Sequence, residues 1–144
     1  MTLQVEKITR DDQLTAAYSI RKEVFVDEQK VDPDKEYDEF ENVSKHFIAY
    51  LDDEPVGTAR WRITPNGVKM ERFAVLKKVR GRGVGQALVK AVLEDVESNP
   101  EAATLKKYLH AQLSAVPLYL KFGFEKVGDI FEECNIMHYK MQLP

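Results

Sequence analysis

Cysteine is nearly absent from this 144-residue chain, which contains only Cys134. One thiol cannot form an internal disulfide or a multi-cysteine metal site, so disulfide-rich and zinc-ribbon proteins are excluded and we expect no metal. Apolar runs never approach the roughly 18 residues of a membrane span, and the first ten residues alternate in polarity, unlike a secretion signal. We therefore expect a single cytoplasmic domain over residues 1–144 with no membrane partner.

Charge of one sign dominates each of two segments. Residues 72–93 contain no acid but six bases, whereas residues 27–41 contain eight acids and two lysines, although the whole chain carries a net charge of only -3. This asymmetry indicates two ligands of opposite charge, with a plain solvated surface as the alternative. A nucleic-acid-binding protein is disfavoured, because the chain is acidic overall and no aromatic platform accompanies the bases.

Hydrophobic periodicity predicts strands and helices in a mixed order. A first strand over residues 3–8 precedes a helix that begins near residues 9–12 and continues to Phe25, and a loop is expected after Pro33. Three strands of a meander follow at 46–51, 56–63 and 68–75. The remaining expected elements are a helix over 84–96, a strand over 107–113 parallel to the third meander strand, a short helix over 115–122, and closing strands over 123–128 and 136–142. The sequence therefore predicts an α+β (mixed α/β) domain.

The stretch "RGRGVGQAL", residues 80–88, follows a predicted strand and opens a predicted helix. Its main-chain N–H groups can converge on an anion at the positive end of that helix, and glycines let phosphates approach closely. Bases surround the start of this helix and acids its end, which is the reverse of what the helix dipole prefers, so a ligand would supply the missing negative charge. A flexible connector with solvated arginines is the simpler alternative.

The spacing of the glycines excludes two common nucleotide-binding motifs. The nucleoside-triphosphate loop needs a Gly-Lys-Ser/Thr ending, and the dinucleotide fingerprint needs glycine where Gln86 and Leu88 stand. The pattern Arg80-x-x-Gly83-x-Gly85 after "ERFAV" instead resembles the pyrophosphate motif of the GNAT superfamily of acyl-CoA N-acyltransferases. Downstream, "HAQLSAVPLYLKFGFEKVG" is similar to the second acyl-CoA segment of that superfamily. The resemblance covers nearly the whole chain.

The resemblance implies a GNAT-type fold: a mostly antiparallel sheet of six or seven strands with a splayed parallel pair, flanked by about four helices. It also implies acetyl-CoA as cosubstrate. The strand before the glycine turn would bulge and pair with the pantetheine arm, and one of its N–H groups would face the thioester oxygen. The cofactor-binding residues implied in this way are Phe73, Ala74, Val75, Arg80, Gly81, Arg82, Gly83, Val84, Gly85, Gln86, Gln112 and Tyr119.

Acyl transfer to an amine needs an acid for the thiolate and a route for the proton of the amine. The resemblance makes Tyr119, four residues before Gly123-Phe124, the candidate acid. Glu71 and Glu28 are alternative bases that would act through water, and His138 is a weaker candidate base. Cys134 is a weaker candidate for carrying the acyl group, since no activating neighbour can be identified from the sequence. A non-catalytic acyl-CoA-binding or sensing module remains the alternative to an enzyme.

Within the superfamily, "RKEVFVDEQKV" and "ECNIMH" resemble the small bacterial ElaA-like branch. Asn135 and Met137 replace the Gly and Pro expected there. The substrate-binding residues implied are Arg21, Phe25, Glu28, Gln29 and His138. Asp32, Asp34 and Glu36 would then form an acidic rim for a cationic amine. The expected partner is a small-molecule or peptide amine, not a nucleic acid, and a homodimer is left open.

Overall fold

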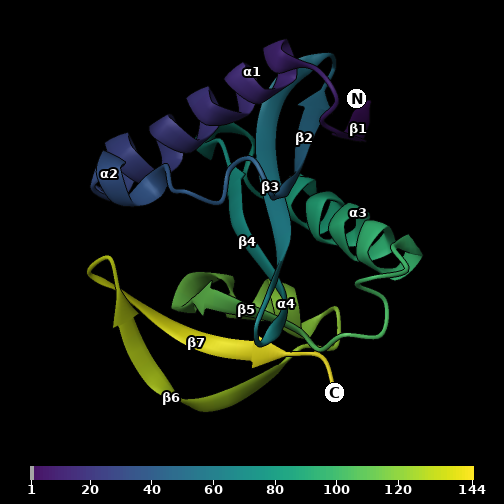
Figure 1. The fold of residues 1–144 in the computed structure, drawn as a ribbon. Helices are drawn as coiled ribbons and strands as arrows, with labels where there is room; N and C mark the ends of the chain where they lie inside the picture. The colour runs from purple at the N-terminus through teal and green to yellow at the C-terminus, as the bar shows by residue number, and fades with distance from the viewer. Residues whose placement is uncertain (1) are drawn as a thin grey trace.

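Seven strands form one sheet in the computed structural model, which describes residues 2–144 (Figure 1). The order across the sheet is β1-β2-β3-β4-β5-β7-β6. The strands are β1 (Leu3–Lys7), β2 (Lys45–Leu51), β3 (Glu54–Thr64), β4 (Gly67–Val75), β5 (Lys107–Gln112), β6 (Glu125–Glu133) and β7 (Ile136–Gln142). All pairs are antiparallel except β4 with β5. The predicted fold class is therefore confirmed.

The helical elements lie in the connections between the strands. They are α1 (Asp11–Arg21), the π-helix η1 (Lys22–Glu28), α2 (Pro33–Glu36), the 3-10 turn η2 (Lys77–Val79), α3 (Val84–Ser98), the 3-10 turn η3 (Leu113–Ala115) and α4 (Val116–Leu120). None of the helices within residues 2–144 is long and apolar enough to cross a membrane.

The predicted meander forms as β2, β3 and β4. Asp52 and Asp53, with φ of 50° and 68°, make the tight turn between β2 and β3. Two successive left-handed residues match the twist of a hairpin, and aspartate tolerates this conformation better than most residues. The alternating apolar side chains of these strands then face the helices and form the core, in which Val56, Ala59 and Trp61 are almost fully buried.

The first helix differs from its prediction. We expected one helix up to Phe25, but the α-helix ends at Arg21 and a π-helix continues to Glu28. Its wider turn is seen in the bond from the N–H of Gln29 to the carbonyl of Val24, five residues back. Val24 and Phe25 are buried, as their apolar character predicts.

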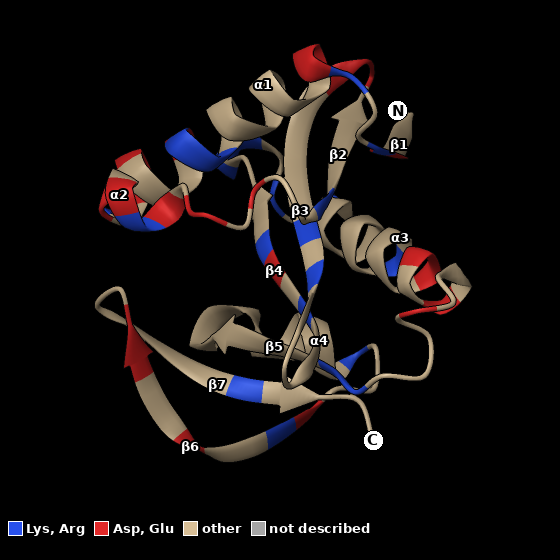
Figure 2. Cartoon of the chain, in the orientation of Figure 1, with Lys and Arg blue, Asp and Glu red and all other residues tan. Residues whose placement is uncertain are grey.

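The loop expected after Pro33 also differs, because it contains the short helix α2. Pro33 occupies the first turn, where its missing N–H costs nothing, and the Asp32 carboxylate accepts from the N–H of Asp34 at 2.9 Å. Sequence periodicity does not detect a helix of this length. The acids of this segment lie on α2, at the left edge of the view, and along the loop after it, which runs back toward the middle of the molecule (Figure 2).

The parallel pair opens after a short contact. β4 and β5 pair only at Val68 with Lys107 and at Lys69 with Tyr108, and the strands then diverge (Figure 1). β4 also contains a bulge, because Thr58 pairs with Ala74 but Arg60 pairs with Glu71, which leaves one extra residue on β4. The splayed pair and the bulged strand, both implied by the resemblance, are present.

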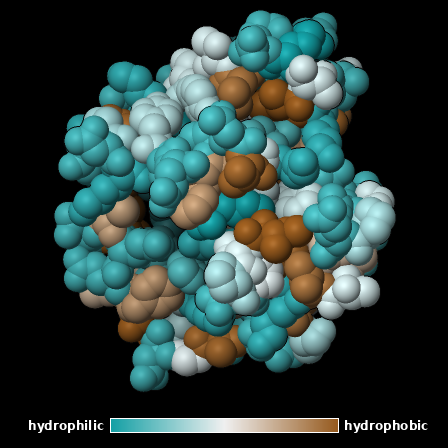
Figure 3. Space-filling model, in the orientation of Figure 1, coloured by the Kyte–Doolittle hydropathy of each residue, from teal (hydrophilic) through white to brown (hydrophobic). Residues whose placement is uncertain are grey.

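Helix α3 packs against the sheet through the predicted apolar stripe, in which Leu88, Val92 and Val96 are fully buried. The helix approaches β3 closely at Gly57, where a Cβ would lie 3.0 Å from the Leu88 side chain. This packing fixes the start of α3, and therefore the glycine turn, beside the end of β4. On the face drawn in Figure 3, apolar side chains form separate patches among hydrophilic ones.

Candidate active site

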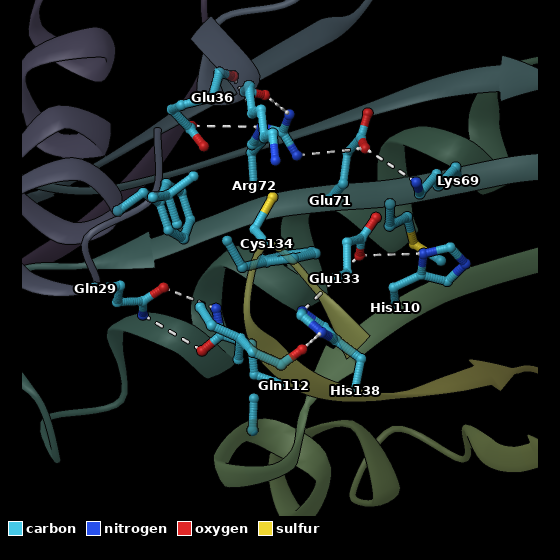
Figure 4. A pocket seen from close by; sticks show the side chains of 17 residues that line it. Gln29, Glu36, Lys69, Glu71, Arg72, His110, Gln112, Glu133, Cys134 and His138 are labelled. Atoms are coloured by element: carbon cyan, nitrogen blue, oxygen red, sulfur yellow. Dashed lines mark hydrogen bonds and ion pairs between the residues drawn. The ribbon is translucent and has the colours of Figure 1, made fainter. Parts of the chain in front are cut away.

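A cavity of about 220 Å³ lies where β4 and β5 separate (Figure 4). Its walls come from η1 and α2 on one side and from the β6–β7 hairpin on the other. Six residues predicted for the site line it, namely Phe25, Gln29, Glu71, Phe73, Gln112 and His138. The structure thus joins segments up to 113 residues apart in the sequence, from Phe25 to His138.

The glycine turn lies outside this cavity, between β4 and α3. Gly81 and Gly83 have φ of 85° and 86°, and a Cβ at either would meet no atom within 4 Å. Gly83 caps α3 without any side-chain hydrogen bond, and the first turn of the helix contains no acid. The first N–H groups of a helix have no partner within the helix, and with the open space at Gly81 and Gly83 this end of α3 could accommodate an anion such as a pyrophosphate.

Gly85 has a different role in the same turn. A Cβ there would lie 3.3 Å from the Leu118 side chain, so a larger residue would push α4 away from α3. Val84 is buried beside it, whereas Gln86 and Arg82 are exposed. The turn therefore joins a ligand-facing surface to a packed contact that holds α4 in place.

Arg80, at the start of the glycine turn, and Glu28, at the end of η1, form an ion pair. Two bonds of 2.6 and 2.7 Å join the guanidinium to both carboxylate oxygens, and Arg80 Nε also donates to the carbonyl of Val75 at 3.0 Å. The hydrogen bonds from Arg80 lower the pKa of Glu28. A predicted base and a predicted phosphate ligand are thus bound to each other, and neither lines the cavity.

The adjacent residue, Gln29, makes a second contact across the cleft. The side-chain amides of Gln29 and Gln112 exchange hydrogen bonds of 2.8 and 3.3 Å (Figure 4). Two consecutive residues at the end of η1 therefore hold Arg80 and Gln112, which are both predicted acyl-CoA contacts.

Glu71 is tightly held by cations. Its Oε2 accepts from Arg60 at 2.7 and 3.0 Å and from Arg62 at 2.7 Å, and Lys69 lies 3.5 Å from its Oε1. Burial alone would raise the pKa of Glu71, but these cations lower it. Glu71 reaches the cavity as a stabilised carboxylate, which is a weak proton acceptor.

The acidic segment provides partners for buried arginines. Arg21, with 1% of its side chain exposed, bonds Glu36 at 2.8 Å and Glu41 at 2.8 and 2.9 Å. Glu36 is itself buried and lies 3.4 Å from Arg72. Arg21 does not line the cavity. Glu36 lines it but is buried and paired, so it does not form an open acidic rim. Asp32, the cap of α2, and Asp34 do not line it either.

Tyr119 is buried beneath the site. Its ring packs edge-on against Phe73 at 5.7 Å and Phe124 at 6.1 Å between centroids. Burial raises its pKa well above the usual value, so the hydroxyl keeps its proton. Tyr119 contacts the bulged strand through Phe73 but does not line the cavity.

Several cavity residues were not predicted from the sequence, above all His110 and Glu133. His110 is two residues before Gln112 on β5, so both side chains point to one face, and Gln112 pairs with His138 on β7. Only the strand register brings these residues together. Cys134 lines the same cavity. Within the described residues, no group of three His, Cys, Asp or Glu side chains has a metal-binding arrangement.

The chain matches known proteins over almost its full length. The family described as Acetyltransferase (GNAT) domain matches residues 6–144. YjcF, an uncharacterized N-acetyltransferase of Bacillus subtilis, is 40% identical over 132 residues, covering 91% of this chain and 92% of YjcF. ElaA of Escherichia coli is 31% identical over 134 residues, covering 90% of this chain and 86% of ElaA. The crystal structure of Escherichia coli ElaA superposes with a TM-score of 0.86 and 27% identity, covering 99% of this chain and 100% of that one.

Proposed function

Since the chain belongs to the GNAT acetyltransferase family, we propose that it transfers the acetyl group of acetyl-CoA to a primary amine of a small molecule or peptide. Acyl transfer from acyl-CoA follows from the family. The proposal adds three finer points. The group transferred is acetyl, the acceptor is a primary amine, and the amine attacks directly in a ternary complex. We also propose that residues 1–144 act as one domain.

One observation carries this proposal: the bulged strand β4 has a free edge between the glycine turn and the cavity. Beyond Lys69, β4 has no strand partner on its β5 side. In this proposal, main-chain groups of Phe73, Ala74 and Val75 would bond a pantetheine arm, with its pyrophosphate at residues 80–86. An N–H at Val75 or its neighbour would stabilise charge on the thioester oxygen.

The roles of the side chains follow from their surroundings. Tyr119 keeps its proton and lies against Phe73, which supports a donor to the departing sulfur. Glu71 faces the cavity and would accept a proton only through water, with its basicity reduced by Arg60 and Arg62. Glu28 would become available only after releasing Arg80.

The proposal is tested by measuring thiol release from acetyl-CoA with a panel of amino acids, polyamines, aminoglycosides and peptides, with hydrolysis in the absence of amine subtracted. We expect amine-dependent release for at least one class, confirmed by the mass of the acetylated amine. Silence across the panel, together with stabilisation of the fold by acetyl-CoA against heat, would contradict the proposal and favour an acyl-CoA sensing module.

A further inference from the structure

Three titratable side chains from three strands meet at one end of the cavity (Figure 4). Glu133 of β6 lies with its Oε2 3.5 Å from His110 Nδ1 of β5 and 3.9 Å from His138 Nε2 of β7. The Phe131 ring stacks on His138 and contacts the edge of His110, with centroids 5.7 and 5.0 Å apart. Both imidazoles are therefore oriented toward one carboxylate, and we call these three residues the His-Glu-His cluster.

The polar atoms of this cluster do not satisfy one another through hydrogen bonds of normal length. His138 Nδ1 lies 2.7 Å from the carbonyl oxygen of Ile136. A carbonyl only accepts, so Nδ1 carries a hydrogen, and Nε2 is the ring nitrogen that faces the Glu133 carboxylate. His110 Nδ1 is buried and has no hydrogen-bond partner at normal length. Both contacts with Glu133 are longer than a good hydrogen bond, so a group with several N–H donors could bond the Glu133 carboxylate and His138 Nε2 together.

Glu133 differs from the other cavity acids in having only imidazoles as ion-pair partners among the described residues. The other two acids that line the cavity are neutralised, Glu36 by Arg21 and Arg72, and Glu71 by Arg60, Arg62 and Lys69. Within the described residues, only His110 and His138 lie within ion-pair distance of Glu133. The His110 imidazole, with smaller effects of Lys69 and His138, lowers the pKa of Glu133 to about 2. Glu133 is therefore an anion at neutral pH.

We propose that the His-Glu-His cluster binds the ammonium group of the acceptor and that His138 Nε2 accepts its proton. The acceptor class is then a cationic primary amine whose remaining atoms contact the apolar wall formed by Phe25, Phe73 and Ile136. This inference rests on the proposed function, because it assigns the acceptor site of the same reaction. The other charged groups that line the cavity are Lys35, Glu36, Lys69, Glu71 and Arg72.

The chemistry balances without a further reactant. The ammonium N–H bond breaks and its proton moves to His138 Nε2, which leaves a neutral amine and an imidazolium stabilised by the Glu133 carboxylate. The amine nitrogen then forms the C–N bond as the C–S bond breaks. Tyr119 donates its proton to the departing sulfur, the second proton lost by nitrogen restores the Tyr119 hydroxyl, and His138 returns its proton to solvent. An imidazole suits this role because it exchanges protons near neutral pH.

The decisive variant is His138→Asn, because the Asn amide can still donate to the carbonyl of Ile136 but has no atom at the Nε2 position. With the best amine of the panel, we expect kcat/KM to fall about a hundredfold and its decline toward low pH to disappear. The KM for acetyl-CoA should stay unchanged. The matched control is His46→Gln, a buried histidine whose Nε2 contacts the carbonyl of Glu41 away from the cavity. If His138→Asn keeps the wild-type pH profile, the inference is overturned.

Glu133→Gln tests the carboxylate independently. Because 44% of the Glu133 side chain is exposed, this variant should fold even if His138→Asn does not. Loss of the carboxylate destabilises the imidazolium, so the acidic limb of the kcat/KM profile should move to lower pH. The KM for the amine should rise severalfold while the KM for acetyl-CoA stays constant. A loss of activity with an unmoved acidic limb and an unchanged amine KM would mean a purely structural role.

A binding measurement separates this inference from the proposed function. Imidazole resonances of His110 and His138 are followed by NMR while n-butylamine, or n-butanol as the uncharged control, is titrated into the wild-type protein. We expect the amine to change these chemical shifts at concentrations at least tenfold lower than the alcohol needs. That result would support the ammonium site even if no amine is acetylated. Equal responses to both compounds, or none, would overturn the inference even if acetyl transfer is observed.

Discussion

Glu28 holds Arg80 through two hydrogen bonds of 2.6 and 2.7 Å, although 52 residues separate them in the sequence. Arg80 begins the turn that is expected to bind pyrophosphate, and we expect a phosphate there to compete with Glu28 for the guanidinium. The neighbouring pair of Gln29 and Gln112 also joins η1 to a residue expected to contact acyl-CoA. We therefore expect binding of acyl-CoA to be coupled to the end of η1, where Gln29 lines the cavity.

Replacing Glu28 by Gln should release Arg80 and strengthen binding of acetyl-CoA. An exposed ion pair contributes up to about 1 kcal/mol, so the Kd measured by calorimetry should fall by up to about fivefold. The matched control is Asp27→Asn, which removes an equal charge one residue away from an ion pair with Lys22. Equal effects of the two variants would mean a general charge effect and not competition for Arg80.

Replacing Tyr119 by Phe should lower kcat about a hundredfold, with little change in the Kd for acetyl-CoA. The Tyr119 ring packs against Phe73 and Phe124, and phenylalanine can keep both ring contacts, so the free energy of unfolding should hardly change. Tyr50→Phe, on the distant strand β2, is the control. Full turnover in Tyr119→Phe would remove this residue as the acid.

Acid should destabilise the protein through its buried ion pairs. Burial alone would raise the pKa values of Asp38 and Glu41, but Arg60 and Arg21 lower each to about 2. These carboxylates have pKa values near 4 in the unfolded chain, so their stabilisation is complete above about pH 4.5 and is lost as the pH falls toward 2.

The contribution of Glu41 can be isolated by urea unfolding between pH 7 and pH 2. Glu41→Gln should be less stable than wild type at pH 7 and should lose less stability on acidification, because one low-pKa group is gone. Glu39→Gln, at an exposed position of the same segment, should follow the wild-type curve. Identical slopes for Glu41→Gln and wild type would show that Glu41 does not contribute to the acid sensitivity.

Gly67 is the first residue of β4 and precedes the two residues that pair with β5. Its φ is +125°, and a Cβ would lie 2.3 Å from the carbonyl oxygen of Lys106. Gly67→Ala should therefore cost more than about 3 kcal/mol in the free energy of unfolding, since backbone must move. Gly128→Ala has a positive φ of +76° but no atom within 4 Å of the added Cβ, so only about 1–2 kcal/mol is expected. Similar losses would mean that the contact at Gly67 relaxes easily.

Local signals predicted most of the elements and the family. The alternation in β2 to β4, the stripe of Leu88, Val92 and Val96, and the spacing of Arg80, Gly83 and Gly85 are each encoded within about a dozen residues. Short-range patterns cannot show that η1 has π-helical turns, nor that a four-residue helix starts at Pro33. Those features depend on how Val24 and Phe25 reach the core.

The candidate site was predictable only in part, for the same reason. The sequence by itself determined a mixed α+β chain with a phosphate turn, a tyrosine after it and a block of acids. Only the tertiary structure decided which charges are already paired, because Arg21, Arg60 and Arg72 come from elements remote from Glu36, Asp38 and Glu41. It also decided that Glu133 meets His110 and His138, since ion pairs depend on distance in space and strand register sets that distance.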